Sequence, residues 1–195
     1  MDAGHDSSPY RAPDGVIEER LATRAKPFFL APPASKLVVM MVFTLGWYVV
    51  WWFYRAWRAV KRHDRSRINP AWRSIFGIFY AYACFRAINR ISAGSTQERK
   101  APAGLLAIAY VVLALTALLP VPLWLLFPLS ALPLLPMNAK ARRYNQFVDA
   151  AVYRDEDGFN AWNWLAIVVG GICWAILLLA TLFYLISFLV PATSA

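Results

Sequence analysis

Residues 37–65 read LVVMMVFTLGWYVVWWFYRAWRAVKRHDR, and this stretch decides the fold class. Its first part, residues 37–54, carries no charge, and a helix of that length is roughly 27 Å long. The hydrocarbon core of a bilayer is about 30 Å thick. The stretch therefore predicts a first transmembrane helix, which ends in Trp and Tyr rings of the kind favoured at the headgroup level.

Positive charge begins where these aromatic residues end. If the helix continues past Arg55, five basic side chains fall within about a third of its circumference and form one stripe. Each basic residue close to an anionic membrane contributes about 1 kcal/mol to binding. The candidate contacts with lipid headgroups are Arg55, Arg58, Lys61, Arg62, Arg65, Arg73, Trp51, Trp57 and Trp72. The competing interpretation is that the charge merely sets the orientation of the chain.

Composition and charge agree with a membrane protein. Apolar residues make up 59% of the 195 residues, whereas about 45–50% is usual in soluble domains. The net charge of +9 lies in residues 55–100, which hold eleven basic residues against Asp64 and Glu98. The other polar segments are close to neutral. The positive-inside rule explains this distribution, so we expect these residues in the cytoplasm and expect no nucleic-acid partner.

The chain divides into a flexible polar tail, residues 1–36, and a single transmembrane helical domain, residues 37–195. Asn69 and Pro70 suit the cap and first position of a new helix. This helix, about residues 70–90, has only twelve apolar residues between Arg73 and Arg86. Twelve residues are too few to cross a bilayer, so the pattern predicts an interfacial or re-entrant amphipathic helix.

Two long uncharged stretches complete the predicted domain. Pro120 and Pro122 divide the first into spans at about 103–119 and 123–139, or else end one span before a Pro-rich surface segment. The last span covers about residues 162–190. Its small residues are spaced for close helix packing, which makes Ala166, Gly170, Gly171 and Ala175 candidate packing positions. The expected fold is all-α and polytopic, with about four spans, both termini outside and both charged loops inside.

No motif points to catalysis, a cofactor or a metal. The two histidines, His5 and His63, lack a paired carboxylate at a recognisable spacing. There is no Gly-rich phosphate loop and no C-x-x-C or H-E-x-x-H pattern. The acidic residues 155–157 do not match the spacing of a calcium loop. We therefore expect no enzyme, no cofactor and no catalytic residue.

Three motifs resemble those of a family of small, uncharacterised bacterial inner-membrane proteins. They are WFYRAWRAVKR at 52–62, INPAWRSIFGIFYAYACFRAINR at 68–90, and N-x-W-N-W at 160–164. SPYRAP at 8–13 is similar to the family's N-P-Y-A-P-P opening, with an Arg inserted. The resemblance implies a multipass protein of the bacterial inner membrane and brings no activity with it. Tails with that opening often lie in the cytoplasm, whereas the charge count places this one outside.

These observations predict a non-catalytic integral membrane protein. The first expectation is an accessory or scaffolding subunit of a membrane complex, with other membrane-protein subunits as partners. The alternative is a protein that interacts with anionic lipids or the membrane surface. A small transporter or channel component is a second alternative, disfavoured because no ionisable Asp, Glu, Lys or Arg lies inside the predicted spans.

Overall fold

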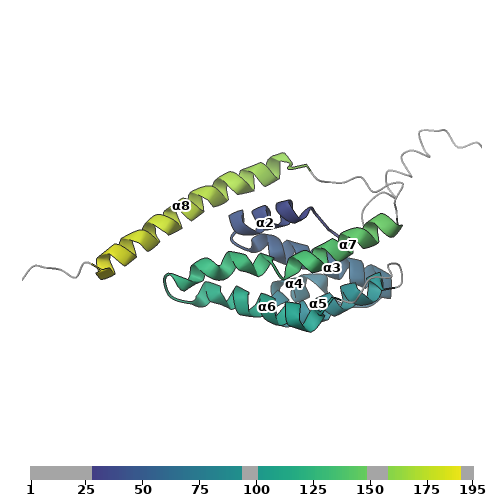
Figure 1. Ribbon diagram of the computed structural model, residues 1–195. Helices are drawn as coiled ribbons and strands as arrows, with labels where there is room; N and C mark the ends of the chain where they lie inside the picture. The colour runs from purple at the N-terminus through teal and green to yellow at the C-terminus, as the bar shows by residue number, and fades with distance from the viewer. Residues whose placement is uncertain (1–27, 94–100, 149–157, 190–195) are drawn as a thin grey trace, which may run out of the picture.

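The computed structural model describes residues 28–93, 101–148 and 158–189, and every element in these ranges is helical. This confirms the all-α class. Figure 1 shows a bundle of helices with one long helix along its side. The elements are α2 (Ala34–Phe43), α3 (Trp47–Asp64), α4 (Pro70–Ile75), α5 (Gly77–Ser92), α6 (Ala103–Leu115), η1 (Thr116–Leu118), η2 (Leu123–Ala131), α7 (Leu134–Val148) and α8 (Ala161–Leu189).

The chain reverses direction inside the first expected span. Leu45 and Gly46 have positive φ angles of 50° and 85°, and they separate α2 from α3. The Thr44 hydroxyl accepts a hydrogen bond of 2.9 Å from the Tyr48 N–H, which supports the start of α3. Residues 37–54 therefore form two arms of a helical hairpin rather than one span, because a left-handed turn cannot continue an α-helix.

A second hairpin follows, made of α4 and α5. The Asn69 side chain accepts hydrogen bonds from the N–H groups of Ala71 and Trp72 at 3.1 and 3.4 Å, and Pro70 occupies the first helical turn, as predicted. The helix breaks at Phe76, whose ψ of 36° is not helical. The segment expected at about 70–90 is thus two helices, of which α5 runs on to Ser92.

The third hairpin runs from α6 through η1 and η2 to α7. The chain turns at residues 119–122, where the sequence places Pro120 and Pro122, and η2 returns along α6. The returning arm differs from the expected span at 123–139. It is a 3-10 helix that contains Pro128, and it passes into α7 at Leu134.

Helix α8 matches the last predicted span almost to the residue. Within the described ranges, Ala161–Phe188 is the one helix long and apolar enough to cross a membrane, so the expected count of about four such helices is not observed. Glycines and prolines in the other apolar stretches break them into short pieces. Gly170 lies against α2, where a Cβ would come within 1.7 Å of the Phe43 carbonyl oxygen.

Two asparagines of α7 fasten the segment before α2 to the bundle. The Asn145 side chain exchanges two hydrogen bonds with the Phe29 backbone, at 2.9 and 2.8 Å. Asn138 donates to the Pro32 carbonyl at 2.6 Å and accepts from the Trp52 indole at 3.1 Å. Residues 28–33 are therefore packed against the bundle, so the predicted flexible tail at 1–36 is wrong for this part; residues 1–27 lie outside the described ranges.

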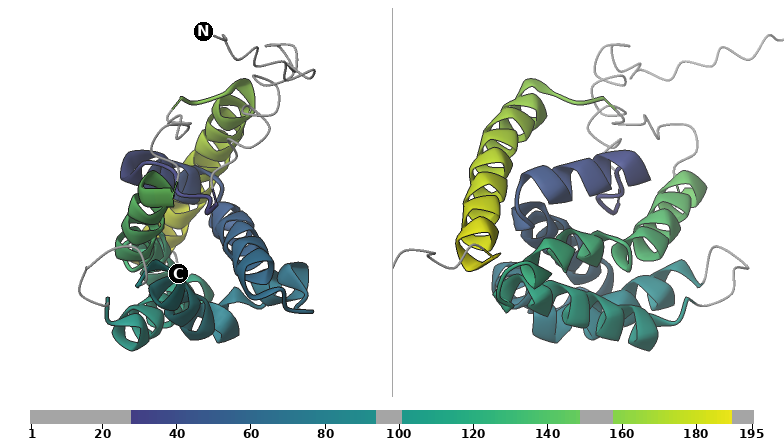
Figure 2. Two further views of the ribbon diagram at one scale, coloured as in Figure 1. Left: turned by 90° about the vertical axis from the view of Figure 1, so that its right-hand side faces the viewer. Right: turned by 60° about the vertical axis from the view of Figure 1, so that its left-hand side comes forward.

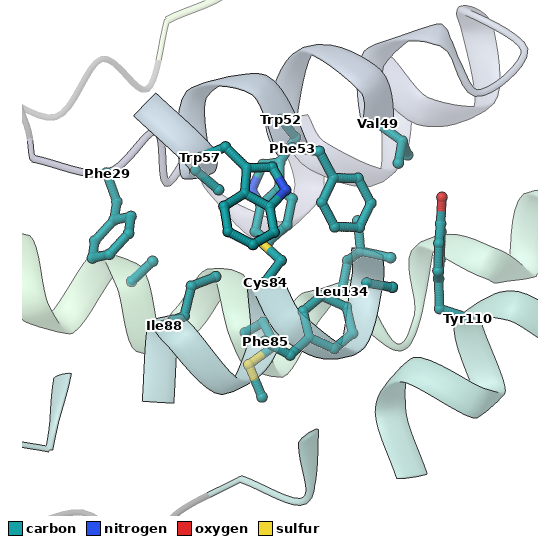
Figure 3. Packing of buried hydrophobic residues seen from close by; sticks show 14 of the residues in the cluster. Phe29, Val49, Trp52, Phe53, Trp57, Cys84, Phe85, Ile88, Tyr110 and Leu134 are labelled. Atoms are coloured by element: carbon teal, nitrogen blue, oxygen red, sulfur yellow. The ribbon is translucent and has the colours of Figure 1, made fainter. Parts of the chain in front are cut away.

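Aromatic side chains fill the middle of the bundle, as Figure 3 shows. Trp52 and Phe53 of α3 are almost completely buried. The rings of Phe53 and Phe85 stack with centroids 6.2 Å apart, which joins α3 to α5. Gly77 lets α5 approach this cluster, since a Cβ there would lie 3.1 Å from the Phe53 ring.

The bundle has an apolar end and a polar end. At the apolar end, the turn at Gly46, the α4–α5 break beside Ile75, and Phe127 of η2 surround one small cavity. Figures 1 and 2 show the α6–η2 turn on the same side of the molecule as the turn between α2 and α3. At the polar end, Arg90 of α5 forms an ion pair with Asp64 of α3. The three hairpins thus point their turns in one direction.

Candidate membrane-surface site

The predicted basic stripe lies on one continuous helix except for Arg65, which follows the last helical residue and has a left-handed φ of 46°. Helix α3 extends ten residues beyond Tyr54, so residues spaced three and four apart share one face. Arg55 is half-buried, while the rest of the stripe is exposed. These exposed residues are Arg58, Lys61, Arg62 and Arg65.

Two arginines of the stripe lie over aromatic rings one turn earlier. The Arg55 guanidinium is 5.9 Å from the centre of the Trp51 ring, and that of Arg58 is 5.8 Å from the Tyr54 ring. Such cation–π contacts are worth about 0.5–1 kcal/mol at exposed sites. They hold each planar guanidinium at the surface, where its N–H groups can form bidentate hydrogen bonds with a phosphate.

Arg73 and Trp57 form an inner layer beneath this surface. The Arg73 guanidinium lies 4.6 Å from the Trp57 ring and 5.3 Å from the Tyr80 ring, between α3 and α5. Trp57 is only 2% exposed, so it is a core residue and not a surface contact. Trp51 and Trp72 are 49% and 58% exposed, as a residue that touches headgroups must be.

Arg62 has a second role in holding the fold. It donates a hydrogen bond of 2.8 Å to the Phe28 carbonyl, and its guanidinium lies 5.5 Å from the Phe28 ring. Burial, followed by repulsion from Arg58 and Arg55, lowers the pKa of Arg62. It therefore belongs both to the stripe and to the contacts that fasten residues 28–36.

Basic residues far outnumber acidic ones among the residues that the structure describes. The described ranges contain thirteen Lys and Arg residues, and Asp64 is their single acidic residue. The His63 ring nitrogen Nδ1 lies 2.9 Å from one carboxylate oxygen of Asp64, and Arg90 binds the other. The hydrogen bonds with His63 and then Arg90 lower the pKa of Asp64 below its usual value. Both oxygens of this carboxylate already bind His63 and Arg90, so Asp64 does not neutralise the stripe.

Several basic residues outside the predicted set lie in the described ranges. Arg142 and Arg143 lie in the second half of α7, next to Tyr144, whose ring contacts Phe28 at a centroid distance of 5.4 Å. Their position in the sequence predicts that these two residues lie on the same side as the stripe, and they are not among the predicted headgroup contacts. The signal for them was their position directly after the last apolar residues of the third hairpin.

The candidate packing residues of α8 divide into two groups. Gly170 is buried at the crossing with α2, and a Cβ on Gly171 would meet the Phe43 ring at 3.7 Å. The Trp174 indole nearby donates a 2.8 Å hydrogen bond to the Val42 carbonyl near the end of α2. These glycines serve contacts within the chain, whereas Ala166 is half-buried and Ala175 is exposed.

The described ranges contain no cluster of three or more His, Cys, Asp or Glu side chains suited to a metal. No protein-family model matches the chain, and no curated protein or solved structure is significantly similar to it.

Proposed function

We propose that the chain is an integral membrane protein that binds anionic lipid headgroups through its polar end. The observation that carries the proposal is the row of basic side chains along α3, in which two arginines lie over aromatic rings. The phosphate groups of anionic lipids carry the charge that complements this stripe. The resemblance of the aromatic and basic motifs to bacterial proteins supports the inner membrane as the location.

In the proposed arrangement α8 spans the bilayer and the hairpins enter it from the side of the polar end. Residues 161–174 run beside α2 and are roughly 21 Å long, and residues 175–189 continue for roughly 22 Å beyond it. Helix α2 is roughly 15 Å long, and α6 with η1 is roughly 24 Å. A complete span needs about 20 residues, so re-entrant hairpins fit these lengths better than four full spans.

Cysteine labelling at the α6–η2 turn tests this arrangement. The probe is a membrane-impermeant maleimide added to sealed vesicles that hold Leu119→Cys in a Cys84→Ala, Cys173→Ser background. A re-entrant turn stays unlabelled from either side and reacts only after detergent is added. Arg67→Cys, in the loop before α4, is the matched control and reacts from one side. Labelling of Leu119→Cys from the opposite side would show a full span and overturn the arrangement.

Lipid analysis tests the binding function. The protein is extracted with a polymer that retains native lipid, and the bound phosphatidylglycerol is compared with the bound phosphatidylethanolamine. Changing Arg55, Arg58, Lys61 and Arg65 to Gln should lower phosphatidylglycerol enrichment at least twofold. Arg62 is left unchanged because it holds Phe28. Equal enrichment in both proteins would overturn the proposal.

A matched variant separates charge from geometry. Arg55→Lys, Arg58→Lys and Arg65→Lys keep every positive charge but remove the planar groups that lie over Trp51 and Tyr54. If charge alone acts, this variant retains the wild-type enrichment. If the stacked guanidinium groups matter, enrichment falls between that of the wild type and that of the Gln variant.

A role as an accessory subunit is the second proposal. The observation that favours it is the far half of α8, which extends beyond α2 with Ala175 and its neighbours exposed. The test is a pull-down in mild detergent with Ala175→Leu. Gly170→Leu is unsuitable, because it would disturb the crossing with α2. A partner that is lost in Ala175→Leu supports the role, and unchanged partners, or none, exclude it.

A further inference from the structure

An open apolar groove of about 420 Å³ lies between α5 and α6. Its walls are hydrocarbon and ring surface, and no charged side chain lines it. The residues that shape it include Ile78, Phe79 and Tyr82 of α5 with Gly104, Ile108 and Val112 of α6. Phe79 and Ile108 are 79% and 64% exposed, so the groove opens to the surroundings of the bundle.

The sequence of α6 creates this groove. Gly104 carries no side chain where α6 passes Tyr82, and a Cβ there would lie 3.9 Å from the Tyr82 ring. Ile108 and Val112 follow at intervals of four residues, so all three share one face of the helix. The absence of a side chain at Gly104 leaves the groove open at the end that lies nearer the polar end of the bundle.

Arg86 lies at this polar-side end of the groove. It follows Phe79 by seven residues and Tyr82 by four, so it lies on the same face of α5 and closer to the polar end. Helical side chains lean toward the N-terminus, which directs Arg86 back over the groove. Arg86 is exposed and forms no ion pair within the described residues. A free cation therefore borders one end of an apolar channel.

We propose that this groove holds one acyl chain of an anionic diacyl phospholipid, whose phosphate binds Arg86. The volume lies within the usual range of about 300–1,000 Å³ for ligand sites. Charge and apolarity are arranged along the groove in the same order as in a phospholipid, with the charged group toward the polar end. The proposal rests on the membrane insertion proposed above, but it concerns α5 and α6 and not the stripe on α3.

Native mass spectrometry of detergent-purified protein tests the site. Phosphatidylglycerol and phosphatidylcholine are titrated separately into delipidated protein, and the bound copies are counted. The wild type should hold one phosphatidylglycerol molecule at concentrations where further copies are absent. It should bind phosphatidylcholine at least fivefold more weakly. The absence of a first, tighter copy of phosphatidylglycerol would overturn the proposal.

Two variants separate the binding of the acyl chain from the binding of the headgroup. Ile108→Trp fills the groove from an exposed position and should weaken the first copy of both lipids at least tenfold. Val168→Trp, at a similarly exposed position on α8, is the control and should bind as the wild type does. Arg86→Gln should abolish the preference for phosphatidylglycerol by weakening its binding at least fivefold, and should weaken the binding of phosphatidylcholine, whose phosphate charge is offset by choline, much less. Equal binding by Ile108→Trp and Val168→Trp would overturn the proposal.

The stripe variant separates this site from the proposed surface function. With Arg55, Arg58, Lys61 and Arg65 changed to Gln, the single tight phosphatidylglycerol should remain while bulk enrichment falls. If the wild type shows no bulk enrichment but keeps the tight copy, the surface function fails and the groove site stands. Loss of the tight copy in the stripe variant would place the lipid on α3 and overturn the groove site.

Discussion

Helix α8 and the first hairpin begin from similar sequences and reach different structures. Both contain long uncharged runs rich in Leu, Val and aromatic residues, yet α8 continues for 29 residues and α2 ends after ten. Gly170 and Gly171 sit inside α8 without breaking it, whereas Gly46 lies in a left-handed turn. The difference lies in what each glycine contacts: Gly170 meets the end of α2, and Gly46 meets the Phe127 ring. A glycine in an apolar run thus serves either as a crossing point or as a turn.

The largest expected effect on stability comes from breaking the hydrogen bonds between Asn145 and Phe29. The hairpins depend on these contacts, whereas α8 does not take part in them. Asn145→Ala leaves the buried Phe29 N–H and C=O groups without partners, at about 1–3 kcal/mol each. The free energy of unfolding in detergent, followed by Trp fluorescence, should fall by about 2–6 kcal/mol. The exposed neighbour Gln146→Ala should change it by less than about 0.5 kcal/mol. Equal stability of the two variants would contradict the prediction.

The next effect separates the two regions at their crossing. Gly170→Ala places a Cβ where the Phe43 carbonyl oxygen now lies and should cost about 1–3 kcal/mol. The stacking of Trp124 on Trp174, with centroids 5.5 Å apart, should weaken and change the near-UV circular dichroism. Gly171→Ala is the matched control, since its Cβ makes only an ordinary contact. A spectrum for Gly170→Ala that matches the control would show that α8 is not held there.

A smaller effect tests the turn that makes the first hairpin unlike α8. Gly46 has a φ of 85°, and an alanine in this left-handed conformation costs about 1–2 kcal/mol. The free energy of unfolding of Gly46→Ala in detergent should fall by this backbone cost alone, because the Phe127 ring can move away from the added Cβ. Gly158→Ala, where a Cβ meets nothing within 4 Å, should leave stability unchanged. A neutral result for Gly46→Ala would mean that the turn is not required.

The smallest effect concerns pH at the polar end. The folded-state pKa of Asp64 is lowered, so its contribution to stability is present above the unfolded value near 3.8 and is lost as the pH falls through the lower folded value. The unfolding temperature should therefore fall less between pH 5 and pH 2.5 in Asp64→Asn than in the wild type. Parallel curves would show that the contacts with His63 and Arg90 do not stabilise the fold.

Local signals in the sequence were sufficient for part of this structure. The last span was predicted because no charge or proline interrupts it, and the start of α4 because Asn69 and Pro70 are a cap and a first turn. The basic stripe followed from helical spacing. These features depend on residues within a turn or two of one another.

The remaining features depend on residues far apart in the chain. The reversal at Leu45 and Gly46 has no proline to mark it and is packed against Phe127, about eighty residues later. Burial of Trp57 results from Arg73 and α5, not from the helix that carries it. No pattern within residues 28–36 predicts that they pair with α7, because the atoms of this segment that the α7 asparagines bind are backbone N–H and C=O groups.

The contact between Phe29 and Asn145 also bears on the order in which the protein is made. The two residues are 116 positions apart, so Phe29 leaves the ribosome long before its partner exists. At the usual 5–20 residues per second, the interval is roughly 6–23 s. During that time the first hairpin is complete in length, but the Phe29 backbone groups have no side chain to bind. The last turn of α7 therefore completes the attachment, and a chain stopped before Asn145 would hold the segment only through Arg62 and Asn138 and leave the Phe29 backbone without its partner.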